Sequence, residues 1–380
     1  MDFGDSGELD AFRDAVRGWL AVNVPEAPPA GEPREQYLRR WHQRLFEAGW
    51  MGLSWPVEYG GRGLTDTHEA ILNEEIGNAR APDAPRIGYL GRAIMRWGTE
   101  EQKQRFIPRL LNGADFWCQG FSEPAAGSDI AAIATRADIT GDTVVINGQK
   151  LWTSYAEYAD WCLLLARSDP ASERHQGISA FAVPMSVQGI SIRPIRAITG
   201  DSEFCEMFFD DVEIPLGNRI GGDGDGWAIA MMTVAHERGA ADVGYLSKFA
   251  RSLEELCAAT AARGAGPSET ERLGLCIVDH LVLSYHVRRR LRERELTGGI
   301  PGPEMSIDKL LMTEADQCLH ETAVDLLGVD ALRDGWNDDD PDSWLHRYMY
   351  SRAASVYGGT EQIQLNILAQ RLLGMPREAT

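Results

Sequence analysis

Cysteine is sparse in this sequence, and none of it is arranged to hold a metal. The six cysteines are scattered over 380 residues without a Cys-x-x-Cys motif. This pattern favours reduced thiols in a cytosol over a disulfide framework, and it gives no reason to expect a metal site. The six are Cys118, Cys162, Cys205, Cys257, Cys276 and Cys318.

Positive charge is also scarce. Lysine and arginine together number 37 against 57 aspartates and glutamates, which gives a formal net charge of -20. A chain of this charge is repelled by a phosphate backbone, and the basic cluster Arg288–Arg290 is too short to reverse that repulsion. We therefore expect no nucleic-acid partner.

Long hydrophobic runs are missing as well. The longest apolar stretch, from Trp227 to Ala235, is far shorter than the roughly 20 residues that a membrane-spanning helix needs. The acidic segment Met1–Asp5 does not resemble a signal or transit peptide, and Arg377–Thr380 carries no peroxisomal address. These features predict a cytoplasmic protein with no membrane partner.

What is present is ordinary globular composition, with 44% hydrophobic and 25% charged residues in a chain long enough for two or three subdomains. Helical spacing of apolar residues dominates up to about Asn112, short β-favouring runs separated by turns follow Asp115, and helical patterns return from Trp227. The sequence thus predicts an α+β protein. Its predicted domains are an N-terminal α-helical domain (1–115), a central β-sandwich or barrel domain (116–225) and a C-terminal α-helical bundle (226–380).

Four motifs follow one another over most of the chain. They are Trp97–Lys103 (WGTEEQK), Gly120–Asp129 (GFSEPAAGSD), Asn147–Ser154 (NGQKLWTS) and Tyr357–Gln364 (YGGTEQIQ). In this order they resemble the motifs of the acyl-CoA dehydrogenase family, in its bacterial type. The resemblance implies the family's fold, in which the C-terminal domain is a four-helix bundle, and it implies FAD as cofactor.

The resemblance also implies flavin contacts. Ser122 and Ser154 would donate hydrogen bonds to the ring edge, while Phe121 and Trp152 would pack on the ring. A Gly-rich turn can offer amides to the pyrophosphate, although Ser-Asp turns are common and this one could be only a local cap. The predicted cofactor-binding residues are Phe121, Ser122, Gly127, Ser128, Trp152, Thr153, Ser154, Thr360 and Gln362.

The expected catalytic base is Glu237. Many family members carry a glutamate directly after the tyrosine of the last motif, but here Gly358 follows Tyr357. A subset that includes isovaleryl-CoA and long-chain acyl-CoA dehydrogenases places the base upstream as Glu-Arg, which matches Glu237-Arg238. The apolar residues before Glu237 predict burial and a raised pKa, although a glutamate on a helix is usually solvated. Arg238 is interpreted as structural.

The resemblance implies α,β-dehydrogenation of an acyl-CoA to the trans-2-enoyl-CoA, with electrons passed to an electron-transferring flavoprotein. Ser128, Tyr357 and Gly358 are the predicted substrate contacts. Two alternatives stay open. One is a non-catalytic subunit that completes the FAD site of a heteromeric partner, and the other is a relative that uses oxygen or an acyl-carrier thioester in natural-product synthesis.

Two departures from the family concern the neighbouring subunit's FAD. Thr270 stands where many members have an arginine, with Arg272 nearby, and Asp325 stands where a glutamine is usual. We expect Asp325 to be turned away from phosphate, salt-bridged or in a rearranged loop. The apolar segment Ile277–Tyr285 predicts a partner surface, so we expect a homodimer, a homotetramer or a heteromer with a related subunit.

Overall fold

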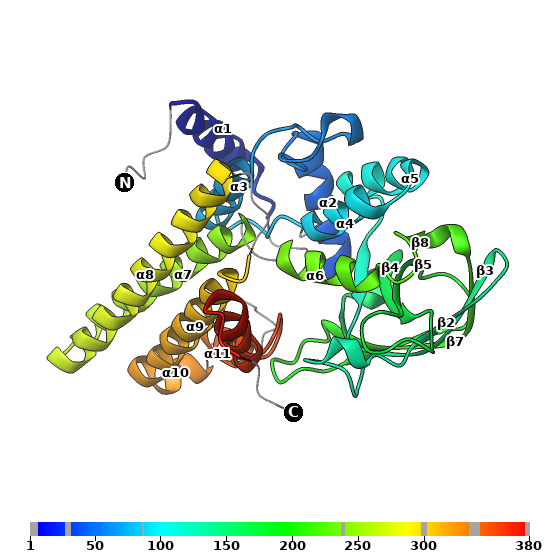
Figure 1. The fold of residues 1–380 in the computed structure, drawn as a ribbon. Coiled ribbons are helices and arrows are strands. Elements are labelled where there is room, and N and C mark those ends of the chain that lie inside the picture. Colours follow the sequence, from blue (N-terminus) through cyan, green and yellow to red (C-terminus); the bar gives the residue numbers. More distant parts are fainter. Residues whose placement is uncertain are drawn as a thin grey trace. The chain divides into compact units, whose positions relative to one another are not determined.

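The computed structural model in Figure 1 describes residues 7–26, 32–85, 87–236, 240–297, 302–333 and 343–376. Contacts divide the chain into two compact units. The sheet unit comprises Pro28–Gly63 and Pro85–Glu237, and the helical unit comprises Met1–Ala27, Leu64–Ala84 and Arg238–Thr380. Each unit is described below by itself.

The sheet unit contains one eight-stranded sheet in the order β6-β7-β3-β2-β4-β5-β8, with β1 pairing on β4. Most neighbouring strands are antiparallel, and β1 runs parallel to β4. The centre of β4 is buried without interruption, as expected for a strand covered on both faces. The strands are β1 (Trp117–Gly120), β2 (Arg136–Thr140), β3 (Thr143–Ser154), β4 (Trp161–Arg167), β5 (Ile178–Pro184), β6 (Ile190–Ile195), β7 (Phe204–Pro215) and β8 (Arg219–Ile220).

Strand β3 is long and irregular near its end. Its pairing with β7 shifts register between Ile146 and Gly148 and again between Lys150 and Thr153. Trp152, inside the second shift, has a positive φ of 61°, which non-glycine residues seldom adopt. Irregularities of this kind re-aim side chains and recur beside active sites.

The helices of the sheet unit are α2 (Arg34–Glu47), α4 (Gly88–Trp97), α5 (Glu100–Leu111) and α6 (Gly226–His236). The first sequence motif forms the start of α5. Thr99 caps the helix, because its hydroxyl oxygen accepts a hydrogen bond from the Gln102 amide. In return, the Gln102 side-chain oxygen accepts a hydrogen bond from the Thr99 amide. The Gln102 side chain also donates to the carbonyls of Gly217 and Arg219, both at 2.8 Å. This motif therefore ties α5 to the turn after β7 and to the first residue of β8.

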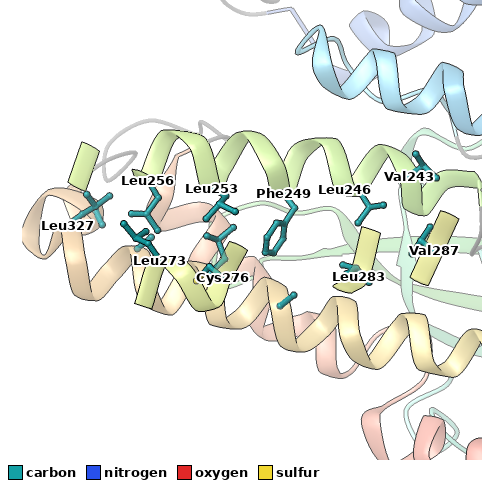
Figure 2. Close-up of a cluster of buried hydrophobic side chains, with 14 of the residues drawn as sticks. Val243, Leu246, Phe249, Leu253, Leu256, Leu273, Cys276, Leu283, Val287 and Leu327 are labelled. Carbon is teal, nitrogen blue, oxygen red and sulfur yellow. The ribbon is translucent and has the colours of Figure 1, made fainter. Parts of the chain in front are cut away.

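The helical unit holds α1 (Gly7–Asn23), α3 (Asp66–Asn78), α7 (Ala240–Ala262), α8 (Pro267–Thr297), α9 (Met305–Leu327), α10 (Val329–Arg333), α11 (Trp344–Ser351) and α12 (Glu361–Ile367). Figure 2 shows its core, in which Phe249 and Leu253 of α7 pack with Cys276 and Leu283 of α8. Leu319 and Ala323 of α9 belong to the same cluster and are fully buried. Long apolar helices thus bury their stripes against one another.

The predicted α+β class is confirmed, with helices before and after a central sheet. The border predicted at 115/116 falls between α5 and β1, and that at 225/226 falls directly before α6. The three-domain division itself stays a prediction, since contacts group α1 and α3 with the C-terminal helices. Within the described ranges, no helix is both long and apolar enough to cross a membrane.

Candidate functional site

The second motif forms a closed turn after β1. Glu123 and Ala126 exchange two backbone hydrogen bonds of 3.0 Å each, which seals the turn. Phe121 is buried before the turn, while Gly127 and Ser128 are exposed after it. Among the described residues, no atom lies within 4 Å of the position a Cβ would take at Gly127. The turn therefore presents accessible backbone and hydroxyl groups, as an anion site requires.

The third motif ends in an exposed aromatic ring. The Trp152 side chain is 57% exposed and makes an edge contact with Phe204, with ring centroids 6.1 Å apart. Ser154 is half-buried, whereas Thr153 is only 1% exposed. Trp152 and Ser154 are thus accessible to a ligand, and the predicted contact by Thr153 would have to come from a buried side chain.

Backbone and side-chain bonds bring these two motifs together. The Leu151 amide donates to the Ser122 carbonyl at 2.9 Å, and the Lys150 ammonium donates to the Phe121 carbonyl at 3.1 Å. Burial lowers the pKa of Lys150, an effect that the Glu123 carboxylate opposes. Burial by itself would raise the pKa of Glu123, but the Lys150 charge and hydrogen bonds outweigh it and hold that pKa low. Phe121 and Ser122 are therefore fixed beside β3.

These groups fit a flat ring with polar edges. The Thr153 hydroxyl is buried and has no hydrogen-bond partner among the described residues, and a buried polar atom of this kind usually has one. An exposed tryptophan held at a positive φ gains from stacking on another flat surface. Together with the open space at Gly127, this arrangement matches an isoalloxazine ring followed by a pyrophosphate.

The fourth motif, in the helical unit, is a double-glycine turn that leads into α12. Thr360 caps the helix by accepting from the Ile363 amide. The buried Gln364 side chain donates to the carbonyls of Gly358 and Gly359 at 3.0 and 3.1 Å. Gln362, predicted to bind the cofactor, is exposed. Sequence reasoning missed the role of Gln364, although its place at the end of the motif was a signal.

The two glycines differ in the space around them. A Cβ at Gly359, where φ is 93°, would come within 2.5 Å of the Gln364 amide nitrogen. At Gly358, where φ is 63°, a Cβ would meet no described atom within 4 Å. At Gly359 a side chain would thus be disfavoured by the left-handed backbone and would displace the Gln364 amide, whereas the position after Tyr357 has room for a side chain that this protein does not supply.

Tyr357 rests on a buried lysine that sequence reasoning did not identify. The Lys309 ammonium lies 4.0 Å from the centre of the Tyr357 ring, a cation–π distance. Lys309 comes from α9 and is almost fully buried. One lysine among the apolar residues of a helix gives no signal of this contact in the sequence.

Glu237 lies outside the described residues, and so does Arg238. The helix before them, α6, is anchored in the sheet unit through Ile229 and Ala230, which are fully buried. A Cβ at Gly226 would come within 2.6 Å of the Ser179 backbone, so α6 begins in direct contact with β5. The expected burial before Glu237 is confirmed at Ile229, whereas four other apolar residues of α6 are only half-buried: Trp227, Met231, Met232 and Val234.

Thr270 and Asp325, the two residues that differ from the family pattern at the neighbouring subunit's cofactor, both have partners within the helical unit. Arg272 of α8 and Asp325 of α9 form an ion pair of 2.6 Å, which confirms the expected salt bridge of Asp325. The Thr270 hydroxyl donates to the Gly266 carbonyl at 2.9 Å in the first turn of α8. Asp325 is therefore compensated inside its own chain.

Family models match nearly the whole chain. The acyl-CoA dehydrogenase N-terminal domain matches residues 6–114, the middle domain residues 118–212 and the C-terminal domain residues 224–373. The chain is 38% identical to acyl-CoA dehydrogenase IpdE1 of Mycobacterium tuberculosis, over 98% of this chain and 99% of that protein.

Two solved structures show the same fold. The Tcur3481-Tcur3483 steroid ACAD is 26% identical with a TM-score of 0.87, covering 100% of both chains. The ChsE4-ChsE5 complex of Mycobacterium tuberculosis is 27% identical with a TM-score of 0.83, covering 99% of this chain and 100% of that one.

Proposed function

Since this chain belongs to the acyl-CoA dehydrogenase family, whose members are FAD-dependent oxidoreductases acting on the CH–CH bond of acyl-CoA, we propose that Glu237 is its catalytic base. The observation that carries this proposal is Gly358. The residue after Tyr357 has no side chain, although the space around it is open. A base must therefore come from another segment, and Glu237-Arg238 matches the family's second position for it.

Glu237 would take the α-proton of the thioester, and the product would be the trans-2-enoyl-CoA. Burial of this carboxylate beside the substrate would raise its pKa toward the range useful for a base. Ser128 of the sheet unit, and Tyr357 and Gly358 of the helical unit, are the proposed substrate contacts.

The cofactor would be held mainly by the two joined motifs of the sheet unit. FAD, when bound, supplies the acceptor for the β-hydride. Ser122 and Ser154 would donate to the ring edge, Trp152 would cover the ring, and the Gly127-Ser128 amides would bind the pyrophosphate. Thr360, which caps α12, would contribute from the helical unit.

We expect the purified protein to be yellow and to contain FAD, not FMN, because the Gly127-Ser128 turn is suited to a pyrophosphate. Trp152→Ala should raise the FAD dissociation constant about tenfold, since an aromatic stack contributes about 1 kcal/mol beyond its buried area. Fluorescence titration measures this constant. Tyr59→Ala, in the same unit but outside the predicted set, should leave it unchanged. A colourless wild-type protein that takes up no FAD would contradict the proposal.

The electron acceptor is proposed to be an electron-transferring flavoprotein, since no nicotinamide motif is present in the sequence. The substrate is proposed to carry a bulky acyl group, because of the open space at Gly358 and the likeness to a steroid ACAD. Anaerobic titration with straight-chain, branched and steroid-derived acyl-CoA thioesters tests this through bleaching of the flavin band. Oxygen consumption, or reaction only with a carrier-bound thioester, would favour the natural-product alternative.

The partner is proposed to be a related but different chain. Structures similar to this chain come from complexes that are named for two components. Asp325 brings a negative charge to the position where the family contacts a neighbour's cofactor, and Arg272 is paired with this carboxylate. This observation disfavours a subunit whose only role is to complete a partner's FAD site.

We expect about one FAD for every two subunits in the assembly. The related chain would contribute contacts to the FAD site of this chain, whereas this chain would not contribute contacts to an FAD site in the related chain. Flavin absorbance against total protein, with the mass from light scattering, measures the ratio. A homotetramer with one FAD in every subunit would contradict the heteromeric proposal.

A further inference from the structure

The sheet unit contains a buried ion pair between the two segments that carry the proposed ring contacts. The Lys150 ammonium lies 2.8 Å from a Glu123 carboxylate oxygen, and the side chains are 0% and 7% exposed. Lys150 lies two residues before Trp152 on β3, and Glu123 directly follows Ser122.

A pair this deeply buried has little value for stability alone. Removing both charges from water costs as much as their attraction returns, and apolar residues of similar size often replace such pairs without loss. The pair does, however, fix the local geometry, because each buried charge needs hydrogen-bond partners at defined positions. The partners therefore show what the pair holds.

Each side chain of the pair also forms hydrogen bonds with the backbone of other segments. Lys150 also donates to the Phe121 carbonyl at 3.1 Å. The Glu123 carboxylate also accepts from the amides of Ala134 and Thr135, at 2.6 and 3.0 Å. Three stretches of chain thus meet at one buried salt bridge, namely Phe121–Glu123, Ala134–Thr135 and the part of β3 around Lys150, and two of them carry the residues proposed to touch the ring.

We propose that Glu123 and Lys150 are positioning residues that set the distance between the Phe121-Ser122 segment and the Trp152–Ser154 segment, and through it the affinity for FAD and the polarity at the ring edge. This inference rests on the proposed flavin contacts. Neither residue touches the ring in this scheme, so their effect passes through Ser122 and Trp152.

The test compares two variants of the pair with a matched control. Glu123→Asp keeps the negative charge but shortens the side chain by one methylene, so the carboxylate no longer reaches its partners. Lys150→Met removes the ammonium that donates to the Phe121 carbonyl. Asp115→Asn is the control, because Asp115 is a buried acid in the same unit that bonds Arg109 through both oxygens, at 2.7 and 2.8 Å, outside the proposed site.

Each full-length variant is measured for melting temperature without FAD, for the FAD dissociation constant and for the visible absorption and circular dichroism of bound flavin. We expect both pair variants to raise the dissociation constant about tenfold or more and to shift the flavin bands. The control should lower the melting temperature while keeping the dissociation constant within about twofold of wild type, since it removes the charge of a buried acid from its ion pair but lies outside the proposed site.

The inference is overturned if the pair variants change FAD affinity and the flavin bands no more than Asp115→Asn does at a comparable loss of melting temperature. Should Lys150→Met fail to fold, Glu123→Asp decides alone, because it keeps both charges. A wild-type protein that binds no FAD would refute the proposed function, and the inference with it, whereas wild-type binding with unaffected variants would refute the inference only.

Discussion

Glu237→Gln should keep FAD and acyl-CoA binding and lose turnover by roughly 10²- to 10⁴-fold, the usual share of a positioned base. The amide has nearly the shape of the carboxylate but cannot take the α-proton. Stopped-flow measurement of flavin bleaching reports the reductive step directly, and equilibrium titration with substrate reports binding. Loss of rate with intact binding identifies proton transfer as the missing function.

The matched control is the exposed Glu361→Gln in the first turn of α12, which should leave turnover close to wild type. Wild-type bleaching in Glu237→Gln would remove Glu237 from the mechanism. A variant that loses FAD as well would instead assign Glu237 to folding or cofactor binding.

Adding Gly358→Glu to Glu237→Gln should restore part of the lost rate. The family uses both positions for its base, and a Cβ at Gly358 meets no described atom within 4 Å. The backbone there has a φ of 63°, so a side chain costs about 1–2 kcal/mol of strain. Gly359→Glu is the matching negative control, since its Cβ would collide with Gln364.

Charges on the outer face of α8 should break the assembly apart. Cys276, Leu283 and Val287 face the core of the helical unit, while a second apolar face is 41–58% exposed in the single chain. A contiguous apolar face left exposed on a helix marks a contact with another chain. The residues of this outer α8 face are Leu275, Ile277, Val278, Leu281, Val282 and Tyr285.

We expect Val278→Glu with Leu281→Glu to weaken subunit association by about a thousandfold or more. Each buried aliphatic side chain contributes roughly 1.5–3 kcal/mol, and a buried unpaired carboxylate adds a further cost. Light scattering across a dilution series measures the mass. Ser268→Glu, exposed near the start of α8, adds the same charge outside the apolar face and should leave the mass unchanged. An unchanged mass in the double variant would mean that this face is not an interface.

The sequence was sufficient for the elements whose signal is local. Apolar spacing predicted α7–α9, short β-favouring runs predicted the strands, and the motif order predicted the family. A salt bridge of Asp325 was also among the expected outcomes, but its partner, Arg272, lies 53 positions away in the sequence and was not predicted.

Long-range partners were not predictable in this way. Glu123 and Lys150 are 27 positions apart, and the bond between them depends on how the turn after β1 folds against β3. The tie from Gln102 to Gly217 spans 115 positions. The burial of Thr153 depends on the register shift in β3. A shift by one residue moves the following side chains to the opposite face of the sheet, and the amino-acid composition of the strand does not reveal where it occurs.

The two apolar faces of α8 have a consequence for how the protein must be produced. A subunit made without its partner would expose the outer α8 face to water, where it favours aggregation over correct folding. If association is coupled to folding, the melting temperature rises with protein concentration, because partner binding stabilises only the folded state. Production together with the related chain should then yield more soluble protein than mixing chains purified separately.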